Sequence, residues 1–102
     1  MATVRLEIIN GAFEGTTYDL TEDAVVIGRN PTTDITLLDE GISREHALLL
    51  FDEEAPGYVI EDLASTNGTQ LNGKRIRSAP LSEGDEIQIG QTLFRFVLIK
   101  DV

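Results

Sequence analysis

The sequence contains no cysteine and a single histidine, and both facts restrict its chemistry. Without cysteine, disulfide bonds and thiolate metal sites are excluded. His46 is the one imidazole that could act as a general base or a metal ligand. The acidic residues are scattered or lie in turns, as at residues 52–54 and 61–62, and lack the spacing of a calcium loop. We interpret them as a solvated face, and we expect no metal and no cofactor.

Long apolar segments are also missing. No apolar run approaches the ~20 residues of a membrane span, and the first residues lack the profile of a signal peptide. We therefore expect no membrane insertion and a cytoplasmic location. A length of 102 residues predicts a single domain over residues 1–102, with its core at about residues 4–99.

Basic residues are scarce, since 8 of them face 18 acidic residues and give a net charge of −10. Such a surface repels nucleic acid and anionic membranes over most of its area. Residues 64–82 are the exception, because they contain Lys74, Arg75 and Arg77 and no acidic residue. A basic island on an acidic protein suggests a small anionic ligand, although a solvated hairpin explains the charges about equally well.

Short apolar runs alternate with turn residues along the whole chain. Apolar and polar side chains alternate with period two in residues 4–9 and 86–89, which is typical of strands. No window of helical length keeps apolar residues at helical spacing without turn residues. The pattern predicts an all-β sandwich of two antiparallel sheets, with binding residues on loops gathered at one end. We expect the first and last long runs, residues 4–9 and 92–99, to pair.

Two segments match catalytic motifs incompletely. Ser43 and His46 are three residues apart, but residues 41–45 lack the final glycine of a nucleophile elbow. Residues 68–75 match a phosphate loop until Arg75, which stands where a serine or threonine should bind magnesium. No helix is predicted to follow, as that motif requires. We therefore predict that the chain is not an enzyme.

Three further segments join predicted strands to loops and offer hydrogen-bond donors. They are Ile27–Asn30, Ser43–His46 and Ser65–Thr69. An arginine at a strand end, such as Arg29, can bind two oxygens of a phosphate in a planar fork. Ser43 and Thr66 can add hydroxyl donors, and Arg44 a second charge. Asn67 has an amide that can both donate to and accept from a peptide main chain.

These segments, in this order, resemble the forkhead-associated (FHA) domain family, which recognises phosphothreonine. The family pattern is Gly-Arg, then Ser-x-x-His, then Ser/Thr-Asn-Gly-Thr and a further Asn-Gly. The matching residues here are Gly28-Arg29, Ser43 to His46, Ser65 to Thr69 and Asn72-Gly73. The resemblance covers about residues 4–99 and implies an FHA-type sandwich of about eleven strands with its ligand loops at one end.

The resemblance also implies roles for single residues. It assigns phosphate contacts to Arg29, Ser43, Arg44 and Thr66. It assigns the peptide backbone to Asn67. The residues with an implied structural role at the site are Gly28, His46, Gly68 and Asn72.

The expected function is that of a phosphothreonine-peptide recognition module mediating phosphorylation-dependent protein–protein interaction in signalling. The phosphothreonine would belong to a partner protein or peptide, or to the same parent chain. The alternative is a phosphate-independent FHA-like scaffold that self-associates. Asp39 and Glu40, just before Ser43, are expected to disfavour acidic side chains after the phosphothreonine. The partner, its kinase and the oligomeric state stay open.

Overall fold

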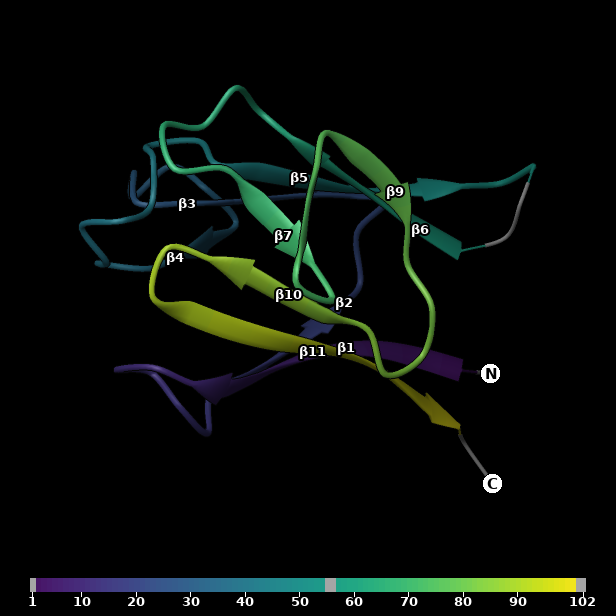
Figure 1. Cartoon of the computed structure of the whole chain (residues 1–102). Helices are drawn as coiled ribbons and strands as arrows, with labels where there is room; N and C mark the ends of the chain where they lie inside the picture. The colour runs from purple at the N-terminus through teal and green to yellow at the C-terminus, as the bar shows by residue number, and fades with distance from the viewer. Residues whose placement is uncertain (1, 55–56, 101–102) are drawn as a thin grey trace.

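Two β-sheets face each other in the computed structural model, which describes residues 2–54 and 57–100 (Figure 1). The six-stranded sheet has the order β2-β1-β11-β10-β7-β8, and the five-stranded sheet has the order β4-β3-β5-β6-β9. The strands are β1 (Ala2–Asn10), β2 (Thr17–Leu20), β3 (Ala24–Gly28), β4 (Ile35–Thr36), β5 (Ala47–Asp52), β6 (Gly57–Asp62), β7 (Thr69–Leu71), β8 (Lys74–Ile76), β9 (Ser78–Pro80), β10 (Glu86–Ile89) and β11 (Thr92–Lys100). The predicted all-β sandwich of eleven strands is confirmed. Within the described part of the chain, no helix could cross a membrane.

The core lies between the sheets and follows the period-two alternation of the sequence. Leu6 and Ile8 of β1 pair with Phe96 and Phe94 of β11, and all four side chains are at most 2% exposed. The second sheet and its loops cover them with apolar side chains. These are Val25, Ile27, Ile35, Leu37, Ile42, Ala47, Leu49, Tyr58 and Ile60. Burial on this scale is the main term that stabilises a domain of this size.

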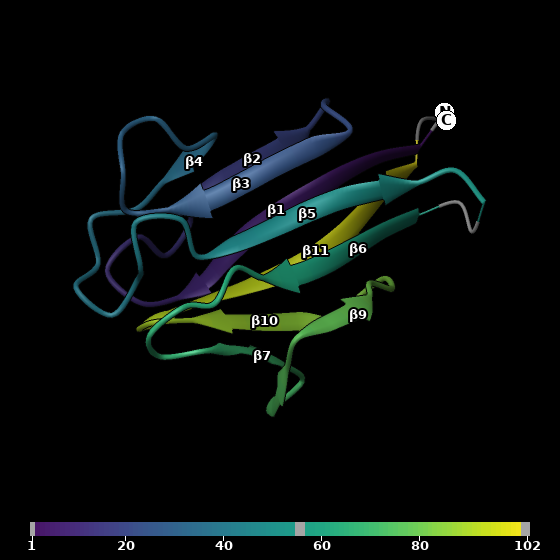
Figure 2. The same cartoon turned by 90° about the horizontal axis from the view of Figure 1, so that it is seen from above.

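The first and last long strands lie side by side. β1 and β11 pair antiparallel from Ala2 opposite Lys100 to Ile8 opposite Phe94, which confirms the predicted pairing. The start of β1 and the end of β11 lie at one end of the sandwich, and the loops after β3, β4 and β6 lie at the other (Figures 1 and 2).

One strand pair departs from the expected antiparallel arrangement, because β4 runs parallel to β3 at the edge of its sheet. Two consecutive strands can run parallel only if the connection between them carries the chain back along the first strand. Residues 29–34 make that return, and hydrogen bonds from Thr33 N–H and Thr32 N–H to Asn30 oxygens stabilise it. Edge strands of two residues carry too short a pattern to be recognised from sequence.

The β7–β8 hairpin occupies the segment that partly matched a phosphate loop. Its turn is Asn72-Gly73, with φ of 51° and 86°, the left-handed conformation that tight hairpin turns require. β8 follows directly, so the helix that a phosphate loop needs is not there.

Candidate functional site

The loops after β3 and β4 are joined by main-chain hydrogen bonds. Arg29 N–H donates to the Ser43 carbonyl over 3.0 Å, and Asn30 N–H donates to the Arg44 carbonyl over 3.1 Å. These bonds hold Arg29 at the end of β3 beside Ser43 and Arg44, which lie fourteen and fifteen residues further along the chain.

This close approach depends on Gly28. The residue is buried, and a Cβ at this position would overlap the carbonyl oxygen of Arg44. Backbone lies on that side, so the neighbour cannot rotate away as a side chain would. Gly28 therefore lets the second loop pack directly on β3.

Arg29 and Arg44 line one hollow of about 420 Å³ together with Asn30 and Pro31, here called the Arg29–Arg44 hollow. Both arginines are exposed, and among the described residues no carboxylate lies within 4.0 Å of either guanidinium. Two like charges beside one cavity destabilise each other unless an anion lies between them. The hollow therefore favours a negatively charged group from outside.

The loop after β6 joins this cluster through Ser43. Thr66 N–H donates to Ser43 Oγ over 3.0 Å. Because the oxygen accepts this bond, its own proton remains available for an acceptor on a ligand. Ser43 and Thr66 thus lie together, as the sequence pattern predicted.

His46 links the same two loops from inside the protein. It is 0% exposed; its Nδ1 accepts from Ser43 N–H over 3.0 Å, and its Nε2 lies 2.9 Å from the Gly68 carbonyl. Since Nδ1 accepts, the ring proton belongs on Nε2, which donates to Gly68. Both nitrogens are occupied by backbone groups, so the ring is not placed to remove the proton of the Ser43 hydroxyl.

Asp62 supports the third loop, and reading it as a solvated acid was wrong. Its carboxylate accepts from Ser65 Oγ at 2.5 Å, Ser65 N–H at 3.1 Å and Thr69 Oγ1 at 2.7 Å. Burial would raise the pKa of Asp62, but the bonds from Ser65 and Thr69 outweigh it and hold the pKa below its ordinary value. Aspartate side chains commonly bond nearby backbone groups in turns, but the sequence does not distinguish such a residue from one that faces water.

Asn67 and Asp39 fix the loop after β4 from two sides. Asn67 Nδ2 donates to the Gly41 carbonyl over 3.0 Å, which leaves its amide oxygen for a ligand. The Asp39 carboxylate accepts from Gly41 N–H at 2.7 Å and from Gln91 N–H at 2.9 Å. Asp39 thus anchors this loop to the β10–β11 turn, a role that its sequence position did not predict.

Asn72 lies away from the cluster, at the opposite end of β7. Its side chain accepts from Glu86 N–H and donates to the Asp85 carboxylate, both over 3.0 Å. It braces the β7–β8 hairpin against the start of β10, and among the described residues its side chain makes no hydrogen bond to the three loops. The other eight predicted site residues lie at the loop end.

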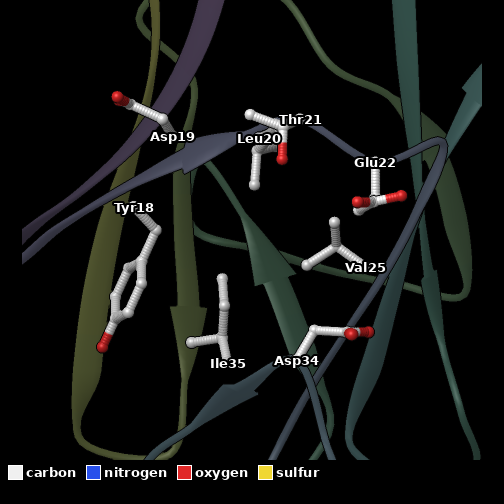
Figure 3. Close-up of a pocket in the computed structure, with 8 residues that line it drawn as sticks. All are labelled: Tyr18, Asp19, Leu20, Thr21, Glu22, Val25, Asp34 and Ile35. Atoms are coloured by element: carbon white, nitrogen blue, oxygen red, sulfur yellow. The ribbon is translucent and has the colours of Figure 1, made fainter.

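A separate hollow of about 290 Å³ lies between β2, the start of β3 and the start of β4 (Figure 3). Asp19, Glu22 and Asp34 are among its lining residues, and Asp19 is paired with Arg5. The negative charge of the hollow makes it unsuitable for a phosphate.

The model of the FHA domain family matches residues 25–90, a range that contains all three loops and both arginines. The chain belongs to the FHA domain family. It is 38% identical to the oxoglutarate dehydrogenase inhibitor of Corynebacterium jeikeium over 92% of this chain and 62% of that protein. It is 37% identical to the glycogen accumulation regulator GarA of Mycolicibacterium smegmatis over 92% of this chain and 57% of that protein. This FHA domain thus spans about three fifths of these relatives, which are named as an inhibitor and a regulator.

Solved FHA structures have the same fold. One comes from an analysis of phosphothreonine-dependent FHA domain interactions and aligns with a TM-score of 0.85 at 31% identity, covering 98% of this chain and 99% of that one. EmbR of Mycobacterium tuberculosis, in complex with a low-affinity phosphopeptide, aligns with a TM-score of 0.87 at 32% identity, covering all of this chain and 26% of that one.

Proposed function

We propose that this FHA domain binds phosphothreonine in a partner protein, or elsewhere in its own parent chain, and performs no catalysis. The observation that carries the proposal is the Arg29–Arg44 hollow, in which two exposed guanidinium groups have no carboxylate within 4.0 Å among the described residues. A phosphothreonine brings ~−1.5 to −2 charges and three strong acceptor oxygens. Its charge offsets the repulsion between the two arginines.

Each site residue has a distinct task in this proposal. Arg29 and Arg44 bind phosphate oxygens, and Ser43 donates the hydroxyl proton that its bond from Thr66 N–H leaves free. Thr66 lies beside them and adds a hydroxyl. Asn67 holds the main chain of the peptide with its free amide oxygen. Gly28, His46 and Gly68 keep these groups in place.

Relatives support a regulatory role. EmbR was solved with a phosphopeptide, and two curated relatives are named as an oxoglutarate dehydrogenase inhibitor and a glycogen accumulation regulator. We propose that the domain likewise recruits a kinase product, in the cytoplasm, and thereby makes an interaction dependent on phosphorylation.

The test is selection from a peptide library with a fixed phosphothreonine, alongside the same library with unmodified threonine and one with phosphoserine. We expect binding to the phosphothreonine library and none to the unmodified one. Equal capture of both would contradict the proposal and favour a phosphate-independent scaffold.

A further inference from the structure

The basic island of the sequence forms a second hollow beside the loop after β6. This hollow, of about 670 Å³, is lined by Asp62, Ala64, Ser65, Arg75, Ile76 and Arg77, and is here called the Arg75–Arg77 hollow. Arg75 and Arg77 are exposed. Among the described residues, neither guanidinium has a carboxylate within 4.0 Å or donates a hydrogen bond.

The acid that lines this hollow is already engaged. The Asp62 oxygens accept from Ser65 and Thr69, and the Asp62 side chain is 14% exposed. It also lies 4.0 Å from His46 Nε2, on the interior side of the loop. Asp62 is therefore directed into the protein. The two arginines determine the charge that a ligand meets in the hollow.

Arg75 lies close to the proposed phosphate site, because its guanidinium packs against Gly68. A Cβ built at Gly68 would lie 2.8 Å from Cζ of Arg75, so the guanidinium rests on the loop that carries Thr66 and Asn67. Residues 66–68 span at most ~7 Å, which places the Arg75 guanidinium within roughly 16 Å of Ser43 Oγ. An extended peptide covers that distance in about five residues at ~3.3 Å each.

We infer that the Arg75–Arg77 hollow is a specificity subsite that binds an acidic side chain, aspartate or glutamate, within about five residues of the phosphothreonine. The inference rests on the proposed function, because the phosphothreonine supplies the anchor. It follows from the unpaired charges of Arg75 and Arg77, their place beside the loop of Thr66 and Asn67, and a shape open to a side chain. Exposed ion pairs contribute up to ~1 kcal/mol each, so we expect an acidic residue at the right position to tighten binding about fivefold.

The test uses a phosphothreonine library degenerate at five positions on each side, selected by the wild-type domain and by the double variant Arg75→Glu, Arg77→Glu. Lys74→Glu is the matched control, because it reverses one charge of the same hairpin without lining the hollow. We expect the wild type and the control to enrich aspartate or glutamate at one position. The double variant should lose that enrichment and still capture phosphothreonine peptides.

The outcomes separate the two proposals. If the wild type binds phosphothreonine peptides but selects no acidic position, or if the double variant keeps the selection, the subsite is overturned and the phosphate site stands. If the wild type captures no phosphothreonine peptide, both proposals fall.

Discussion

Arginines at the loop end and on the sheet faces differ in their partners. Arg5 donates to Asp19 at 2.7 Å, which raises the pKa of its guanidinium, and Arg95 lies 3.3 Å from Glu86. Arg29 and Arg44 have no such partner among residues 2–54 and 57–100, although the protein has 18 acidic residues. Arg5 and Arg95 are thus neutralised within the protein, whereas Arg29 and Arg44 are left for a ligand.

The sheet faces and the loop end also differ in the interactions that stabilise them. Strand pairing and the core fix the sheet faces, so their charged side chains can change with little effect. At the loop end, polar contacts of His46, Asp62 and Asn67 add to a few main-chain bonds and hold three segments together. Polar braces of this kind are costly to remove, because each leaves a buried partner unsatisfied.

His46→Ala should have the largest effect. It removes two hydrogen bonds and leaves Ser43 N–H and the Gly68 carbonyl without their partners, which should lower the free energy of unfolding by about 3 kcal/mol. Urea denaturation followed by circular dichroism measures the loss. A loss below about 0.5 kcal/mol would show that the loops do not depend on this ring.

Arg29→Ala should weaken phosphothreonine-peptide binding about a hundredfold, equivalent to about 2.7 kcal/mol, because it removes charge-assisted bonds to the phosphate. Its melting temperature should match that of the wild type, since the side chain has no partner to lose. Isothermal titration with a selected peptide measures the affinity. Unchanged affinity would remove Arg29 from the site.

Asp62→Asn should destabilise the domain at pH 7 by about 1–2 kcal/mol through weaker bonds from Ser65 and Thr69. The folded state lowers the pKa of Asp62, so the carboxylate stabilises the fold above its unfolded pKa of about 3.9, and this contribution is lost as the pH falls through the folded pKa. Urea midpoints at pH 7, 4 and 2.5 should therefore converge for the two proteins in acid. A constant gap across this range would contradict the assigned role.

Arg95→Ala should have the smallest effect. Its ion pair with Glu86 is 45% and 42% exposed, and such pairs contribute at most about 0.5 kcal/mol here. Phosphopeptide affinity should stay within twofold of the wild type in the same titration used for Arg29→Ala. A loss comparable to that of Arg29→Ala would erase the distinction between the two groups of arginines.

Sequence alone predicted the sandwich, because the alternation of apolar and polar side chains at residues 4–9 and 86–89 indicates which side chains are buried. It also brought Arg29, Ser43 and Thr66 into one site through the family pattern. It predicted a structural role for Gly28 but not that the neighbouring backbone would be the Arg44 carbonyl, since this approach joins segments sixteen residues apart. Asp62 was misread because a carboxylate in a turn looks the same in sequence whether it faces water or its own loop.

The most direct test of the phosphate site is an amide NMR titration of the labelled domain with a selected phosphothreonine peptide and its unphosphorylated twin. We predict phosphate-dependent shifts at residues 29–30, 43–44 and 66–68, and little change at the end of β5 and the start of β6, which lie at the opposite end of the sandwich. Equal shifts with both peptides, or shifts centred away from these loops, would contradict it.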